Sequence, residues 1–239
     1  MSMLGSIYRA ITTLLFGQRC MVCDEPIDHT MHGICIKCRY SIPLTLYSKS
    51  DDNPVKALFD GLAPIEHGSA HFFYSGSDLW RNLVHRFKYG GMWHIAYSMG
   101  RWYGAELKES GLYDDVDVIV PIPLHPLKIL KRGYNQSTYI AEGIARELDK
   151  EVDNRSVKRI RNNPSQARKL AVERWANVEE LFSVRHPERL KGRHILLVDD
   201  VLTTGATISS CIEAILAVVP DCRISVAVLA VSKRRVSKI

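Results

Sequence analysis

The stretch that decides the fold is His194-Ile-Leu-Leu-Val-Asp-Asp-Val-Leu-Thr-Thr-Gly-Ala-Thr207. Its apolar run, Ile195 to Val198, does not alternate with polar residues, which indicates a central strand of a parallel sheet covered on both faces. Asp199 and Asp200 follow at the end of this strand, where open α/β sheets bind their ligands. We therefore expect an α/β fold with a ligand site at this edge of the sheet.

Small and hydroxyl-bearing residues, Thr203 to Thr207, lead from the acidic pair into a helix predicted by apolar residues at helical spacing from Ile208 onward. Such a loop presents backbone N–H groups and a helix N-terminus to an anion such as phosphate. With two carboxylates that accept hydrogen bonds from hydroxyls, it suits a phosphorylated sugar. A Walker B strand is one alternative, but it requires a G-x-x-x-x-G-K-[ST] loop, which the sequence lacks. A strand-turn-helix without a ligand is the other.

Four of the six cysteines form two C-x-x-C pairs that are separated by eleven residues: Cys20, Cys23, Cys35 and Cys38. Four thiolates at this spacing can converge on Zn²⁺, and so small a module would gain much of its stability from the metal. A redox role for either pair is the alternative. Without a secretory signal, this cysteine usage favours a reducing cytoplasm.

Residues 1–17 are predicted to form an amphipathic helix, which could dock on the protein's own core or on a membrane surface or partner. The sequence contains no apolar run near the roughly 18 residues that span a bilayer, so we expect a protein that is not integral to a membrane. The net charge of +6 favours anionic partners, which phosphate-rich metabolites and nucleic acid both satisfy.

A second strand is predicted near Val116 to Val120, and the prolines of Pro121-Ile122-Pro123 then shape the loop that follows it. The cations Lys131 and Arg132 come shortly after this loop, and a rigid loop beside cations suits a diphosphate. Two further basic positions could reach a phosphate or nucleic acid: Lys88 and, within the basic stretch 155–169, Arg168. A mobile lid and a solvated face are the alternatives for that stretch.

The stretch from Leu196 to Thr207 resembles the 5-phosphoribosyl-1-diphosphate (PRPP) signature of type I phosphoribosyltransferases. The order of modules resembles the ComF family, in which a four-cysteine zinc module precedes a phosphoribosyltransferase domain. Three more blocks carry this resemblance: 74–91, the Pro-Ile-Pro-Leu-His and Lys-Arg-Gly-Tyr-Asn-Gln sequences within 121–136, and the stretch from Gln166 to Phe182.

The resemblance implies a Rossmann-like parallel sheet flanked by helices, preceded by a small zinc-ribbon-like module. With the residue patterns above, it divides the chain into an amphipathic helix (1–17), a four-cysteine zinc module (18–45), a connector and helical region (46–114) and a phosphoribosyltransferase-type domain (115–239).

The resemblance also implies roles for particular residues. Asp199 and Asp200 would be the catalytic pair that holds the ribose hydroxyls, in part through Mg²⁺. The remaining PRPP contacts would come from the diphosphate loop and the signature loop: Pro121, Ile122, Pro123, Val201, Leu202, Thr203, Thr204, Gly205, Ala206 and Thr207. Independently of the resemblance, the positive charges of Lys88, Lys131, Arg132 and Arg168 make these residues candidates to contact the diphosphate or nucleic acid. The nitrogen-containing acceptor of such a transferase is not identified by any residue.

Members of the ComF family are associated with DNA uptake in natural transformation. That association implies a cytoplasmic protein, peripheral to the inner membrane, that meets single-stranded DNA and the DNA-uptake proteins. The alternative is a phosphoribosyltransferase of nucleotide metabolism or salvage with no role in DNA uptake. A structural partner-binding protein would not explain the phosphate loop.

Overall fold

The structure is a computed structural model that describes residues 18–28, 33–75, 79–80, 83–84, 86, 91–161 and 181–233. Three sequence predictions lie outside these residues: the helix over 1–17 and the side chains of Lys88 and Arg168. Among the described residues, no helix combines the length and the apolar character that crossing a bilayer requires.

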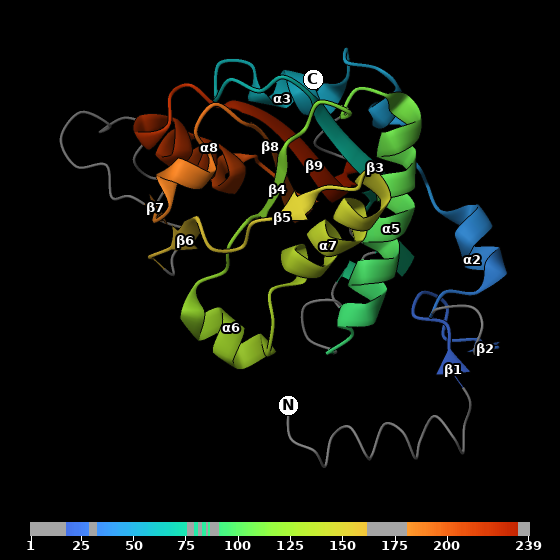
Figure 1. The fold of residues 1–239 in the computed structure, drawn as a ribbon. Helices are drawn as coiled ribbons and strands as arrows, with labels where there is room; N and C mark the ends of the chain where they lie inside the picture. The colour runs from blue at the N-terminus through green and yellow to red at the C-terminus, as the bar shows by residue number, and fades with distance from the viewer. Residues whose placement is uncertain are drawn as a thin grey trace.

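A five-stranded parallel sheet forms the centre of the fold (Figure 1). Its strands, in spatial order, are β3 (Gly68–Tyr74), β9 (Arg223–Ser232), β8 (His194–Leu202), β4 (Val118–Pro121) and β5 (Glu151–Val152). The predicted α/β fold with β8 as its central strand is therefore confirmed.

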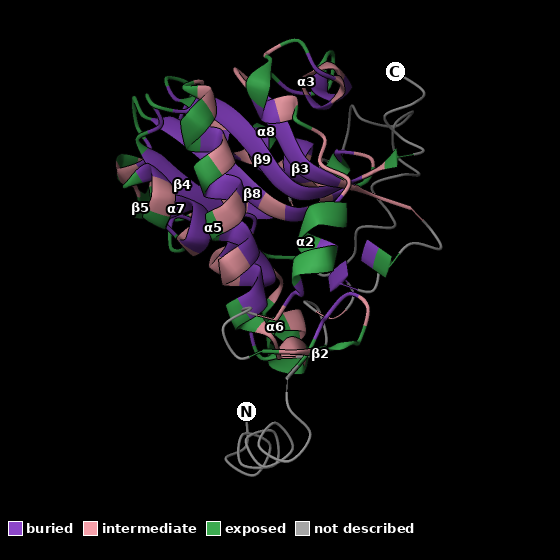
Figure 2. Ribbon diagram, turned by 90° about the vertical axis from the view of Figure 1, so that its right-hand side faces the viewer, coloured by how far each residue is buried: buried purple, intermediate pink, exposed green. Residues whose placement is uncertain are grey.

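Helices cover both faces of this sheet, as Figure 2 shows by the burial of its strands. One face packs against α5 (Trp93–Ser110) and α7 (Gln136–Leu148), and the other against α3 (Pro54–Phe59) and α8 (Ala206–Val218). Leu196 and Val198 of β8 belong to the first core, and Ile195 and Leu197 to the second. The unbroken apolar run is thus explained, because both of its faces are buried.

The edge strand β3 comes from residues that the sequence placed in the connector and helical region. It pairs with β9 in parallel, from Gly68 opposite Val226 to Tyr74 opposite Ser232. The sheet therefore draws one strand from before residue 115, the predicted start of the phosphoribosyltransferase-type domain.

Two short elements surround the carboxyl end of the sheet. Helix α6 (Pro126–Arg132) follows β4, and an antiparallel hairpin is formed by β6 (Val157–Arg159) and β7 (Phe182–Val184). A 3-10 turn at Pro187–Arg189 connects this hairpin to β8, and another at Tyr47–Lys49 precedes α3.

The four-cysteine module consists of the hairpin β1 (Gln18–Arg19) and β2 (Pro26–Ile27) and the helix α2 (Ile36–Ser41). Its apolar residues are not separate from the larger domain. Ile34 and Ile42 belong to the same buried core as Phe72 of β3 and Ile95 of α5. The module therefore packs against the face of the sheet that α5 and α7 cover.

Candidate functional site

The acidic pair lies in the carboxyl-terminal half of β8, and the strand continues past it to Leu202. Asp200 is buried, with 7% of its surface exposed, whereas Asp199 is half-buried. Successive residues of a strand point to opposite faces, so the two carboxylates start on opposite sides of the sheet at its carboxyl end. The strand thus places two acids at the edge where parallel sheets bind ligands.

The N-terminus of α7 holds both carboxylates. Gln136 Nε2 donates to Asp200 Oδ2 at 3.1 Å, and Ser137 Oγ donates to Asp199 Oδ1 at 2.9 Å. Asn135 caps the same helix by accepting from Ser137 N at 3.3 Å, and its Nδ2 donates to the carbonyl of Ile122 at 3.0 Å. One end of α7 therefore fixes the acidic pair and the predicted diphosphate loop together.

Gln136 and Ser137 were not predicted as site residues from the sequence. Their helix does not follow β4 directly, because α6 lies between β4 and α7. The available signal was the block that ends at Gln136, which carries part of the family resemblance.

The signature loop has the conformation that an anion site needs. Gly205 has φ +78°, and a Cβ at this position would lie 3.3 Å from Leu58 Cδ2. No side chain caps α8, although Thr204 Oγ1 accepts from Ala206 N at 3.4 Å. Only glycine adopts this backbone readily, so the loop can turn tightly and present the start of α8 to a ligand.

A cavity of about 680 Å³ lies between the loop after β4 and the β6–β7 hairpin. Neither Asp199 nor Asp200 lines it, but Pro121 does, and Pro121 pairs with Val198, the residue before the acidic pair. Its lining consists of Pro121, Pro123, Leu124, His125, Pro126, Ile129, Asn135, Thr138, Asn154, Lys158, Arg159, Ile160 and Arg185. The two prolines of the predicted diphosphate loop thus border the cavity, whereas the Ile122 side chain lies in the core under α8. Lys131 and Arg132 are in the last turn of α6, outside this lining.

Arg159 is the buried cation of this region. Only 6% of it is exposed, its guanidinium lies 5.4 Å from the centre of the Phe182 ring, and Nε donates to the Arg161 carbonyl at 3.2 Å. Among the described residues, none is a hydrogen-bond partner of its buried Nη2. Burial lowers the pKa of Arg159, and the charge of Asp199 opposes this shift.

The burial of this arginine follows the alternation of a strand. Val157 and Arg159 are buried, whereas Lys158 between them is exposed. A three-residue strand is too short to give a periodic pattern, so the sequence did not predict which cation of the basic stretch is buried.

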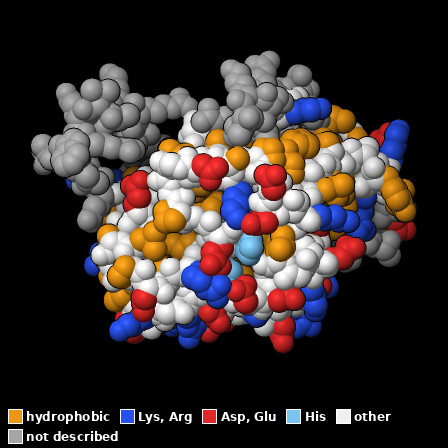
Figure 3. All heavy atoms as spheres, turned by 90° about the horizontal axis from the view of Figure 1, so that it is seen from above, with side chains coloured by type: hydrophobic (Ala, Val, Ile, Leu, Met, Phe, Trp, Pro, Cys, Tyr) orange, Lys and Arg blue, Asp and Glu red, His pale blue; other side chains and the backbone are white. Residues whose placement is uncertain are grey.

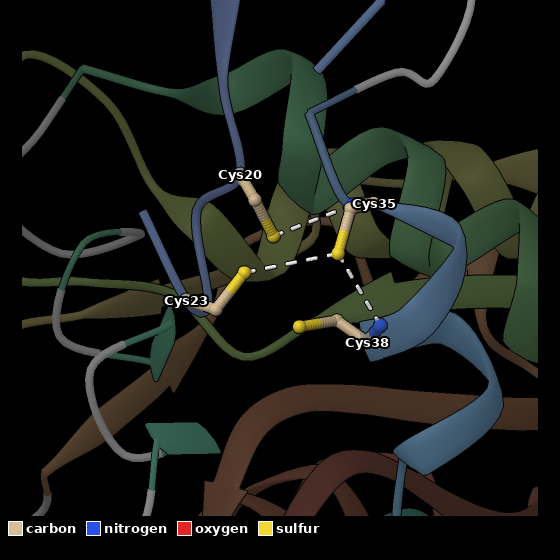
Figure 4. Close-up of side chains that lie close together, drawn as sticks. All are labelled: Cys20, Cys23, Cys35 and Cys38. Atoms are coloured by element: carbon tan, nitrogen blue, oxygen red, sulfur yellow. Dashed lines mark hydrogen bonds between the residues drawn. The ribbon is translucent and has the colours of Figure 1, made fainter. Parts of the chain in front are cut away.

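The four cysteines of the N-terminal module converge (Figure 4). All four Sγ atoms lie within 4.8 Å of one another, and those of Cys23 and Cys35 are 3.7 Å apart. Backbone N–H groups donate to two of the sulfurs, from Cys35 to Cys20 Sγ and from Cys38 to Cys35 Sγ, both at 3.3 Å. Burial raises the pKa of Cys20, but backbone N–H donors outweigh it and lower the pKa to about 7. Such a donor set can hold a tetrahedral metal ion as thiolates.

The remaining cysteines, Cys211 and Cys222, are buried in the core that α8 covers, apart from this cluster. Burial raises the pKa of both thiols. They are therefore poor nucleophiles, as expected for structural cysteines.

Comparison with known protein families matches residues 134–238 to the phosphoribosyl transferase domain. The match begins at Tyr134 and so includes Gln136, Ser137 and the acidic pair, all of which meet at the carboxyl end of the sheet.

Several known proteins are similar to this chain over longer stretches. Competence protein F of Haemophilus influenzae is 25% identical over 211 residues, which cover 81% of this chain and 89% of that protein. Competence protein ComFC of Bacillus subtilis is 30% identical over 193 residues, covering 80% of this chain and 69% of that protein. DNA utilization protein YhgH of Escherichia coli is 31% identical over 138 residues, covering 56% of this chain and 60% of that protein.

Two of these similarities cover about four fifths of this chain. With its parallel sheet, its four-cysteine cluster and these relatives, the chain belongs to the ComF family.

Proposed function

We propose that this protein binds PRPP with Mg²⁺ at the carboxyl end of β8 and acts in DNA uptake. The observation that carries the proposal is the acidic pair, which Gln136 and Ser137 hold a few residues before the glycine turn at Gly205. Gln136 Oε1 is buried without a hydrogen-bond partner among the described residues, so it can accept from a ribose hydroxyl or from a water molecule of a hydrated ion. These donors and acceptors fit a phosphorylated sugar with a bound Mg²⁺.

In this proposal each group has a defined task. The turn from Thr203 to Thr207 binds the 5-phosphate through backbone N–H groups, and Asp199 and Asp200 accept from the ribose hydroxyls. Bound Mg²⁺ would neutralise the charge that develops on the leaving diphosphate. The acidic pair would also favour the positive charge that develops at C1 of the ribose as its bond to the diphosphate lengthens. The protein would thus be a phosphoribosyltransferase, a pentosyl glycosyltransferase.

Calorimetry tests the binding step. Wild-type protein is titrated with PRPP in Mg²⁺, and ribose 5-phosphate serves as a ligand that retains the 5-phosphate but lacks the diphosphate. We expect the double variant Asp199→Asn/Asp200→Asn to weaken PRPP binding at least about 100-fold, or roughly 2.7 kcal/mol. Absence of PRPP binding by folded wild-type protein, or equal affinity in the variant, would contradict the proposal.

The role in DNA uptake is supported by family membership, because relatives of this chain are named competence and DNA utilization proteins. We propose a cytoplasmic location, peripheral to the inner membrane and close to the uptake proteins. Transformation frequency in a deletion strain complemented with the wild type or with Asp199→Asn/Asp200→Asn tests this role. Equal frequencies with and without the wild-type gene would favour the alternative, a transferase of nucleotide metabolism or salvage.

A contact with single-stranded DNA is supported by an exposed aromatic pair. Trp93 is 44% exposed, and its ring lies 5.2 Å from that of Tyr139, at an interplanar angle of 32°. Tyr139 also contacts Tyr134, which follows the basic last turn of α6 with its Lys131. Stacked aromatics near cations are the usual platform for unpaired bases.

Fluorescence anisotropy with a labelled dT20 oligonucleotide tests this contact. Because a stacked base contributes about 1–3 kcal/mol, Trp93→Ala should weaken binding by about fivefold or more. Tyr40→Ala is the matched control, since Tyr40 is 87% exposed on α2 and belongs to a different surface. Equal losses in the two variants would remove the support for this site.

We also propose that the four-cysteine cluster binds a structural Zn²⁺. Because the module shares a core with α5 and β3, loss of the metal should destabilise the whole domain. Cys38→Ser should lose the zinc and lower the midpoint of thermal unfolding by about 5 °C or more, whereas Cys222→Ser should keep the zinc. Metal analysis and calorimetry measure both effects, and a zinc content unchanged in Cys38→Ser would contradict the assignment.

A further inference from the structure

We propose that the cavity between the loop after β4 and the β6–β7 hairpin is the acceptor site and that it takes an organic anion, a ring nitrogen compound that carries a carboxylate. This inference rests on the proposed PRPP site and names the class of the second substrate. Its support comes from the charge, the size and the buried cation of the cavity.

The lining is cationic. Lys158, Arg159 and Arg185 contribute positive charges, and none of the described residues that line the cavity is an aspartate or glutamate. Asp199 and Asp200 do not line the cavity, and the proposed function assigns them to the ribose. A ligand seated here therefore meets a positive environment, which selects for a negative group.

The size and the apolar part of the lining exclude a bare inorganic ion as the only occupant. At about 680 Å³, the volume falls in the range of roughly 300–1,000 Å³ that is typical of sites for organic ligands. Leu124, Ile129 and Ile160 supply apolar surface that a diphosphate would not use. Pro121 and Pro123 lie on the border toward β8, so the diphosphate would occupy only that side of the cavity.

The positive charge of Arg159 has a fixed position, because this side chain is buried and not on the surface. Its guanidinium is packed near the face of Phe182, and Nη2 has no hydrogen-bond partner among the described residues although it is buried. An unpartnered N–H of a buried arginine is costly, and a carboxylate that accepts from it would remove this cost. Arg185, at the opposite end of the hairpin, is exposed and can adjust to the ligand.

The transfer itself balances without another reactant. A lone pair on the ring nitrogen of the acceptor forms the bond to C1 of the ribose while the bond from C1 to the diphosphate oxygen breaks. The electron pair of that bond leaves with the diphosphate. Any proton on the acceptor nitrogen passes to solvent.

Matched ligand pairs test the inference. Nicotinamide has a neutral carboxamide in place of the carboxylate of nicotinate, and uracil lacks the carboxylate of orotate. Each compound is titrated into the full-length protein in the presence of Mg²⁺ and PRPP. Because a hydrogen bond to a charged group contributes about 1.5–3 kcal/mol, we expect the acid of at least one pair to bind about 10-fold or more tightly than its neutral partner. Product formation is followed in the same samples by release of diphosphate.

Variants separate the cavity from the PRPP site. Arg185→Gln, at an exposed position, should reduce the preference for the acid several-fold, and Arg159→Gln should abolish it. Lys191→Gln, which removes an exposed cation outside the lining, should leave the preference unchanged. Circular dichroism checks the folding of Arg159→Gln, and Arg185→Gln keeps the test valid if that variant does not fold.

The outcomes distinguish this inference from the proposed function. Equal binding of acids and neutral partners, binding of neither acid up to 10 mM, or a preference that survives Arg185→Gln and folded Arg159→Gln would overturn the acceptor assignment. In each case PRPP binding by the wild type would still support the proposed function. If folded wild-type protein did not bind PRPP, that result would instead overturn the proposed PRPP site.

Discussion

Strand β8 begins in one polar cluster and ends in another, and the two ends differ in how their polar groups are satisfied. At the amino end, His194 Nδ1 lies 3.0 Å from Asp115 Oδ1, and His194 Nε2 lies 2.8 Å from Ser225 Oγ. Ser225 Oγ also accepts from the backbone N–H of His67 at 3.1 Å. These contacts fix a neutral imidazole that donates from Nδ1 and accepts at Nε2.

Arg223 completes the cluster at the amino end. Its Nη1 lies 2.7 Å from Asp115 Oδ2 and 2.9 Å from Glu66 Oε2. Figure 3 looks onto this end and shows a histidine side chain surrounded by acidic and basic side chains. Glu66, Asp115 and His194 converge closely enough to hold a metal ion, but the Arg223 guanidinium already forms an ion pair with each of the two carboxylates. The order Asp115, His194, Ser225 is also that of a hydrolytic triad, yet Ser225 and His194 are fully buried and out of a substrate's reach.

The carboxyl end is different. Gln136 Oε1 and Arg159 Nη2 are buried there without a hydrogen-bond partner among the described residues. The polar atoms of His194 and Ser225 at the amino end all have partners. Other buried atoms also have no partner among the described residues, so an unpartnered group alone does not mark a binding site: Ser69 Oγ, His71 Nε2, Tyr103 Oη and Ser209 Oγ. The carboxyl end differs because Arg159 lines a cavity that a ligand can enter and so supply the missing partner.

The largest expected effect concerns the carboxyl end and separates binding from stability. In Asp199→Asn/Asp200→Asn, the amide oxygens can still accept from Ser137 and Gln136, and the repulsion between two neighbouring carboxylates is lost. We therefore expect the free energy of unfolding to be unchanged or about 1 kcal/mol higher, while PRPP binding falls at least about 100-fold. Urea unfolding and calorimetry on the same preparation measure the two effects. A loss of stability of 2 kcal/mol or more would mean that the acidic pair is structural.

Much of the fold could be predicted from the sequence, because it depends on local patterns. The apolar run from Ile195 to Val198 predicted a strand buried on both faces, and the two C-x-x-C pairs predicted a cluster that the structure brings together. Strand β3 was missed. It lies at the sheet edge and pairs with β9, which is more than 150 residues away in sequence, so no local pattern identified its partner.

The partners of the acidic pair depend on long-range geometry in the same way. Ser137 is 62 residues from Asp199 and Gln136 is 64 residues from Asp200, and each meets its aspartate only because β4 and β8 are neighbours. In the sequence, Arg159 and Lys158 beside it are both basic residues of the same stretch, so their residue types do not distinguish them. Only the β6–β7 hairpin decides which of the two is buried.

The next largest effect concerns the amino end and should appear in stability alone. Asp115→Ala leaves the buried Nδ1–H of His194 without its acceptor, which costs about 1–3 kcal/mol of the free energy of unfolding. Asp114→Ala is the matched control, because it removes the same charge from the adjacent exposed residue. Urea unfolding measures the difference between the two variants. PRPP affinity should match the wild type in both, and a loss of PRPP binding in Asp115→Ala would show that the two ends are coupled.

A smaller effect is expected from the titration of His194. Burial lowers its pKa below the ordinary value of 6.5, Asp115 and Glu66 oppose that shift, and the charge of Arg223 adds to it. The unfolded chain therefore binds more protons than the folded protein between the folded and the unfolded pKa values. Stability from this group is complete above about pH 6.5 and falls as the pH drops toward the folded pKa.

Urea unfolding of wild type and His194→Asn between pH 7.5 and 5.5 measures this contribution. The wild type should lose stability more steeply than the variant over that range. Asp115 acts in a separate window: burial raises its pKa, but Arg223 and His194 outweigh this and lower it below 3.8. Its contribution is lost only in stronger acid, so equal slopes for the two proteins above pH 5.5 would show that His194 does not titrate as proposed.

The smallest effect tests whether the hydrogen bonds at the start of α7 position the acidic pair. Ser137→Ala removes one of two hydrogen bonds to Asp199 Oδ1, because the backbone N–H of Asp200 still donates to the same oxygen at 2.8 Å. A net hydrogen bond contributes about 1 kcal/mol, so affinity for PRPP should fall about fivefold. Ser98→Ala is the control, because it removes an exposed hydroxyl of α5 that donates to the His94 carbonyl. If both variants bind PRPP as tightly as the wild type, Ser137 has no role in positioning Asp199.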